Sequence, residues 1–151
     1  KLQNKKIGKY TVFKQKLFYY KINLLNNTEP FWYGSKICKK KHLKSPQWLR
    51  DQKVKKYPFW KFYKMKWNII ENGGWHFSFL KSPEEIQKKI KQYAHAEFNK
   101  EKYTSLDRIK NSIENKIDLF DRKLEFKKIE INNNFPNYII ENKELYKDWI
   151  V

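Results

Sequence analysis

Two of the chain's four glycines stand side by side at Gly73 and Gly74, directly before the run Trp75-His76-Phe77-Ser78. A glycine pair permits positive φ angles and close approach of backbone or ligand, so this stretch predicts a tight functional turn. The next polar stretch, Ser82-Pro83-Glu84-Glu85, predicts a helix start, with serine at the N-cap, proline at N1 and glutamate at N3. The sequence therefore predicts a turn or short strand that leads to a helix N-terminus, where the helix dipole favours an anion.

Hydrophobic periodicity predicts the surrounding elements. Apolar residues spaced by three and four predict one helix over residues 83–96 and another from Thr104 or Ser105 to about residue 116. Aromatic and β-branched runs predict strands at residues 17–24, 67–70 and 124–131. Three further segments are expected: a helix or loop at residues 1–15, a short helix at 45–51 and a closing helical segment at 135–149. Together these predict a single α/β domain over residues 1–151, with a mixed sheet and flanking helices.

The chain carries 34 Lys and Arg against 16 Asp and Glu, a formal net charge of +18. Such a surface attracts polyanions, unless the lysine excess only reflects a compositional bias on a solvated face. Residues 53–66 alternate lysines with aromatic rings, which is typical of a groove for single-stranded nucleic acid or of amphipathic strands whose lysines point outward. Forked hydrogen bonds to bases and phosphates are made by arginine, and lysine far outnumbers arginine in this chain. We expect no sequence-specific nucleic-acid partner, and a small basic nucleic-acid-binding module is the alternative function.

Other classes of site are excluded by composition. Cys38 is the only cysteine, so neither an internal disulfide nor a cysteine-rich zinc site can form. No apolar run is long enough to span a membrane, and no signal-peptide pattern opens the chain.

An ordered series of short motifs resembles glycosyltransferase family 17, the family of the β-1,4-mannosyl-glycoprotein 4-β-N-acetylglucosaminyltransferases. The resemblance covers most of the chain and is strongest from Gly73 to the end. Its pieces are Gly73-Gly74-Trp75-His76-Phe77-Ser78, Glu84-x-Ile86, Lys89-Ile90, Ala94-His95-x-Glu97, residues 113–118 and Pro136-x-Tyr138-Ile139-x-x-Asn142. Upstream, Tyr20-x-x-Asn23 and Trp32-x-Gly34 fit the order of the family, whereas Asn115 stands where many members have glycine.

The resemblance implies a GT-A-like fold and an inverting hexosyltransferase. Its donor would be a UDP-sugar, either UDP-N-acetylglucosamine or the nucleotide of a related sugar, and its acceptor a saccharide or glycan. The family's acidic Asp-x-Asp-type motif, which helps a divalent metal (Mn²⁺ or Mg²⁺) to hold the donor diphosphate, has no counterpart before Leu17. We therefore expect this chain to be the C-terminal part of the catalytic domain, with the main metal ligands upstream. The compartment would be the cytoplasm for a microbial or viral protein and the Golgi for a eukaryotic one.

The candidate site residues follow from these motifs. Inverting transfer needs a carboxylate that takes the acceptor proton, and Glu84 is the candidate, although it can instead complement the helix dipole. His76 is a candidate to bind a metal or the diphosphate, or is a buried histidine bonded to backbone. His95 and Glu97 are supporting candidates, which orient each other or favour a helix C-terminus. The candidate donor-binding residues are Gly73, Gly74, Trp75, His76 and Ser78.

Overall fold

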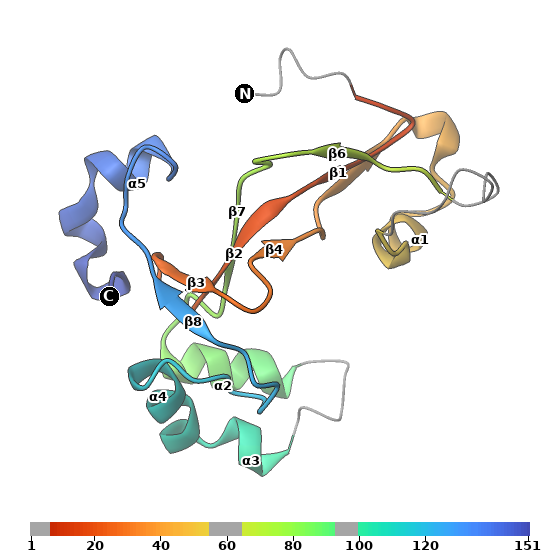
Figure 1. Cartoon of the computed structure of the whole chain (residues 1–151). Helices are drawn as coiled ribbons and strands as arrows, with labels where there is room; N and C mark the ends of the chain where they lie inside the picture. The colour runs from red at the N-terminus through yellow and green to blue at the C-terminus, as the bar shows by residue number, and fades with distance from the viewer. Residues whose placement is uncertain (1–6, 55–64, 93–99) are drawn as a thin grey trace. The chain divides into compact units, whose positions relative to one another are not determined.

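The structure is a computed structural model that describes residues 7–54, 65–92 and 100–151 (Figure 1). Its contacts divide the chain into two compact units. The first unit comprises Lys1–Lys16 and Phe31–Gly74, and the second comprises Leu17–Pro30 and Trp75–Val151. The chain therefore passes from one unit to the other after residues 16, 30 and 74.

The first unit is built on a three-stranded sheet in the order β5-β1-β6. Strand β1 (Tyr10–Phe13) pairs antiparallel with β5 (Lys36–Cys38) and parallel with β6 (Asn68–Ile70). A further short strand, β4 (Phe31–Trp32), pairs with Gln15 and Lys16 at the start of β2. The helical segments of this unit are the 3-10 helix η1 (Lys40–His42) and α1 (Pro46–Asp51).

Two predictions meet opposite outcomes in the first unit. The helix expected at residues 45–51 is confirmed as α1, because the Ser45 side chain caps it by accepting from the Trp48 N–H at 3.0 Å. The helix or loop expected for residues 1–15 is wrong over β1. There Thr11 and Val12 are both fully buried, so this segment is fixed by strands on both of its edges and not by its own lysine-rich surroundings.

The second unit contains a sheet in which β2 (Gln15–Tyr19) pairs with β3 (Leu24–Asn26) and β7 (Trp75–Ser78). Strand β3 also pairs antiparallel with β8 (Phe126–Lys128). The single strand expected at residues 17–24 is confirmed over residues 17–19 and at Leu24 but is wrong between them. There a turn that begins at Tyr20, with φ of 59°, folds this run into a hairpin. The strand expected at 124–131 is confirmed only over the three residues of β8.

Both faces of this sheet are buried, which explains why residues 17–20 are hydrophobic without alternation. Phe18 belongs to a cluster with Ile22, Ile131 and Phe135, which we call the C-terminal cluster. The next residue, Tyr19, points to the opposite face and contacts Phe79 and Phe126 through its ring. The core of the second unit therefore lies on two sides of one sheet.

The helices of the second unit follow the predicted pattern closely. Helix α2 (Pro83–Lys91) has the predicted capping box, with Ser82 and Glu85 bonded to each other's backbone N–H, and buries Ile86 and Ile90. Helix α4 (Leu106–Glu114) confirms the second predicted helix, and α3 (Glu101–Thr104) precedes it unpredicted. Helix α5 (Asn137–Glu141) and the 3-10 helix η3 (Lys143–Trp149) confirm the closing helical segment. Figure 1 shows α2, α3 and α4 gathered together.

Helix α2 ends at Lys91, with Gln92 as its C-cap, which is earlier than the predicted residue 96. Residues 93–99 lie outside the described part of the chain. The sheets and flanking helices together confirm a mixed α/β architecture.

Candidate functional site

The predicted Gly73-Gly74 turn exists, and its contacts lie within the first unit. Asn72 and Gly74 both have positive φ angles, of 52° and 117°. The Gly73 N–H donates to Lys14 O at 2.8 Å, and Gly74 O accepts from the Lys16 N–H at 2.9 Å. A Cβ atom at Gly73 would lie 2.7 Å from Phe13 Cβ. Close approach to neighbouring backbone therefore explains why glycine stands at Gly73, and the left-handed conformation explains Gly74.

Strand β7 presents its side chains in alternation to the two faces of the second unit's sheet. Trp75 and Phe77 pack against the C-terminal cluster, where the Phe77 ring stacks on Phe18 at 5.4 Å between centroids. The Trp75 indole N–H donates to Asn134 O at 2.8 Å. His76 and Ser78 therefore point to the other face, where α2 lies. Trp75 is therefore the one candidate donor-binding side chain on β7 that packs in the core.

The imidazole of His76 is half-buried beside helix α2. Burial first, and then the positive charge of Lys89, lower the pKa of His76 below its ordinary value. The side chain is therefore neutral at pH 7. A lysine ammonium nearby also disfavours a second cation, so His76 is a poor place for a metal ion. Among the described residues, no group of three or more His, Cys, Asp and Glu side chains is placed to hold a metal.

The depressed pKa of His76 makes stability depend on pH. The unfolded chain takes up a proton at this histidine near pH 6.5, whereas the folded chain does so only at lower pH. We therefore expect the free energy of unfolding to fall as pH drops from 7 to 5. The free energy of unfolding of a His76→Gln variant should fall less over the same range. Because His76 is only half-buried, solvent screening keeps the difference in slope below the limit of about 1.4 kcal/mol per pH unit for one proton. Urea unfolding at each pH measures this difference. Equal slopes for both proteins would contradict this prediction.

Glu84 lies at the first turn of α2, and its side chain is exposed. Hydrogen bonds from its own backbone N–H and from Ser82 lower its pKa, and the charge of Lys110 lowers it further. The carboxylate is thus ionised at neutral pH, as a general base must be, but its basicity is reduced. The capping box engages the N–H groups of Ser82 and Glu85. Positive charge for a bound anion must therefore come mainly from nearby lysines.

A pocket of about 440 Å³ opens at this end of α2, and we call it the α2 pocket. It brings together residues from four separate stretches of the second unit. Its lining residues are Tyr20, Lys21, Lys81, Ser82, Pro83, Lys110, Ile113, Glu114, Asp148 and Trp149. None of the predicted site residues that the structure describes lines this pocket, although Lys110 acts on Glu84 from its wall.

The α2 pocket combines three kinds of group that suit a sugar with an attached phosphate. Trp149, which also packs against the C-terminal cluster, lines the pocket with the remaining surface of its indole ring. Glu114 and Asp148 are carboxylates that can accept hydrogen bonds from hydroxyl groups. The three lysines provide positive charge, although Lys21 already donates to Asp148 O at 2.6 Å and Lys81 pairs with Glu85 at 3.1 Å. Sequence reasoning missed these residues because no local motif links them.

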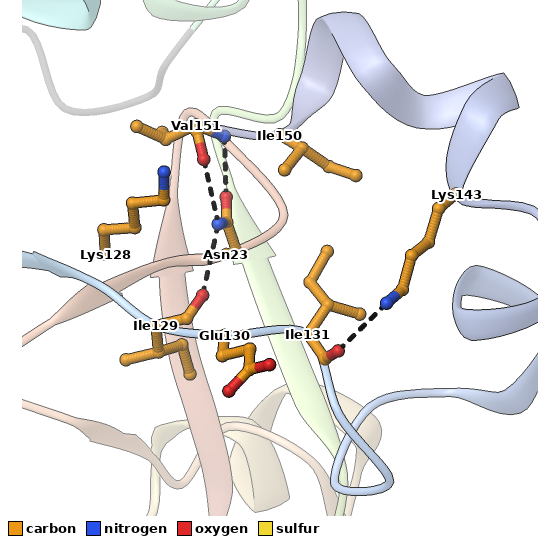
Figure 2. Close-up of a pocket in the computed structure, with 8 residues that line it drawn as sticks. All are labelled: Asn23, Lys128, Ile129, Glu130, Ile131, Lys143, Ile150 and Val151. Atoms are coloured by element: carbon orange, nitrogen blue, oxygen red, sulfur yellow. Dashed lines mark hydrogen bonds between the residues drawn. The ribbon is translucent and has the colours of Figure 1, made fainter.

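A second pocket, of about 460 Å³, lies beside the end of the chain (Figure 2). Figure 2 shows Asn23 at its centre, where the side-chain amide donates to Ile129 O at 3.1 Å and the side-chain carbonyl accepts from the Val151 N–H at 2.8 Å. Tyr20, the other residue of the Tyr20-x-x-Asn23 motif, donates its hydroxyl to Ile117 O and accepts from the Leu119 N–H, both at 3.1 Å. Both motif residues therefore join distant segments of the second unit.

Two predicted features fall outside the described residues. His95 and Glu97, the supporting candidates, lie in residues 93–99, and most of the lysine and aromatic alternation at 53–66 lies in residues 55–64. Within the described ranges, no helix combines the length and the apolar character needed to cross a membrane. No family model matches the sequence, and neither a curated protein nor a solved structure matches it.

Proposed function

We propose that this chain is the C-terminal part of an inverting, GT-A-like glycosyltransferase similar to family 17. It would transfer N-acetylglucosamine from UDP-N-acetylglucosamine to a saccharide acceptor. The observation that supports this most is the α2 pocket, where Trp149, two carboxylates and three lysines meet at the helix start that carries Glu84. An aromatic platform beside charged groups suits a sugar ring that carries a phosphate.

The proposed chemistry assigns one role to each kind of group. Glu84 takes the proton from the acceptor hydroxyl as its oxygen attacks the anomeric carbon of the donor. The bond from that carbon to the diphosphate oxygen breaks on the opposite face, which inverts the configuration. Lys81 and Lys110 then stabilise the negative charge that develops on the leaving diphosphate. His76 and Ser78, on the face of the sheet opposite the C-terminal cluster, remain proposed donor-binding residues. Trp75 instead packs against that cluster, and Gly73 and Gly74 form the turn.

The principal ligands of a Mn²⁺ or Mg²⁺ ion would lie upstream of this chain. The described residues do not supply a donor set for such an ion, since His76 stands beside Lys89 and no cluster of carboxylates accompanies it. No step assigned to these residues therefore depends on a metal.

Donor binding tests the proposal directly. We expect a Lys110→Gln variant of the full-length protein to bind UDP-N-acetylglucosamine about tenfold more weakly, because it loses a charge-assisted contact to the diphosphate. Lys116→Gln is the matched control, since Lys116 is exposed and does not line the α2 pocket. Isothermal titration of the donor, together with an assay of UDP release, measures both. Absence of donor binding and of UDP release in the full-length protein would refute the function.

A further inference from the structure

The positive charge of this protein is concentrated in one of its two units. The first unit contains 18 Lys and Arg against two Asp and Glu, a formal charge of +16, whereas the second contains 16 against 14, a charge of +2. The two carboxylates of the first unit have partners within it. Glu71 pairs with Lys14 at 2.9 Å, and Asp51 accepts from the Gln47 amide at 2.7 Å. Two carboxylates cannot offset 18 basic side chains, so the first unit keeps a large excess of positive charge.

Four aromatic rings gather on the first unit, and we call them the Tyr10 cluster. The ring centroid of Tyr10, at the start of β1, lies 6.1 Å from each of the other three. The others are His42 at the end of η1, Trp48 on α1 and Trp67 before β6. All four are half-buried, so each keeps part of its ring at the surface. Three segments far apart in the sequence thus assemble one aromatic surface around β1.

Lysines surround these rings. The ammonium groups of Lys9 and Lys44 lie over the rings of Tyr10 and Trp48, at 5.3 and 5.5 Å from the centroids. Burial first, and then the charges of Lys9, Lys41 and Lys39, lower the pKa of His42, so these three lysines lie near enough to act on the ring. These lysines are exposed, unlike Lys36, which is held by Arg50 O and Gln52 O at 2.7 and 2.6 Å.

We propose that the first unit binds single-stranded nucleic acid without sequence preference, through base stacking on the Tyr10 cluster and phosphate contacts from the lysines around it. Aromatic rings within a positively charged surface are the features that such binding uses, because every base has a face that can stack. Duplex DNA keeps its bases stacked on each other, so it would use only the lysines. This activity is separate from the proposed sugar transfer, whose pocket lies in the second unit.

Fluorescence anisotropy of a labelled single-stranded oligonucleotide of about 20 nucleotides, titrated with the whole chain over a series of salt concentrations, tests the proposal. We expect Trp48→Ala to weaken binding by about 10–100-fold and Trp48→Phe to keep affinity within about threefold, because phenylalanine can still stack. Replacing the exposed lysines of the cluster (Lys39, Lys41 and Lys44) by glutamine should reduce the dependence of log affinity on log salt concentration by about 2.

The matched control removes the same charge from exposed positions of the second unit, with glutamine at Lys88, Lys91 and Lys116. It should leave affinity nearly unchanged, and circular dichroism verifies that every variant is folded. Equal losses from both lysine triples, wild-type affinity in a folded Trp48→Ala variant, or equal affinity for a matched duplex would each overturn the proposal. So would Trp48-dependent binding to vesicles of phosphatidylserine and phosphatidylcholine without binding to the oligonucleotide, which would point to a membrane surface.

Discussion

A Glu84→Gln variant of the full-length protein is expected to transfer sugar about 10²–10⁴-fold more slowly than the wild type. Glutamine keeps the size and most of the hydrogen bonding of glutamate but cannot accept the acceptor's proton. Donor affinity should be unchanged, because Glu84 does not line the α2 pocket. Steady-state assay of UDP release, with titration of the donor on the same variant, separates the chemical step from binding.

Glu85→Gln is the matched control for this experiment. Glu85 occupies the N3 position of the capping box, where glutamine serves as well as glutamate, so the variant should be folded and active. Both substitutions remove one negative charge from the same helix start, and their common effect on the helix therefore cancels in the comparison. A folded Glu84→Gln protein with near wild-type turnover would remove Glu84 as the base. Glu97, an upstream acid or Glu114 of the α2 pocket would then be the candidates.

Of the substitutions proposed for this protein, loss of the Arg122 side chain should lower the free energy of unfolding the most. Its guanidinium donates to both carboxylate oxygens of Asp118, at 2.6 and 3.1 Å, and the Asp118 side chain is only 3% exposed. These hydrogen bonds raise the pKa of Arg122. Arg122→Ala would leave a buried carboxylate without its counter-charge, which costs about 3 kcal/mol, because water can reach part of the vacated site. Urea unfolding of both proteins measures the loss.

The double variant Asp118→Asn, Arg122→Ala should recover part of this loss, since the buried group is then neutral. The control is Asp121, which pairs with Lys102 and Arg108 but is 41% exposed. Asp121→Asn should cost much less than Arg122→Ala, because solvent screens exposed ion pairs. A similar cost for Arg122→Ala and Asp121→Asn would show that the Asp118 carboxylate does not need its partner in the folded protein.

The sequence by itself determined the features that depend on residues within about four positions of each other. The caps formed by Ser45 and Ser82 were predictable because each side chain bonds to a backbone N–H three residues along the chain. The turn at Gly73-Gly74 and helices α2 and α4 were predictable from glycine's freedom and from apolar periodicity. For the site, this local logic placed Glu84 at a helix start, next to the Gly-Trp-His strand.

Tertiary structure decided everything that depends on contacts between distant segments. Residues 10–13 became a strand because β5 and β6 supply partners on both edges, and residues 17–24 folded back at Tyr20 because a hairpin could bury both faces. The α2 pocket joins Lys21, Lys110 and Trp149, and the Tyr10 cluster joins rings from three segments. The periodicity of one segment cannot predict these contacts, because they depend on how complete elements bury their apolar faces against each other.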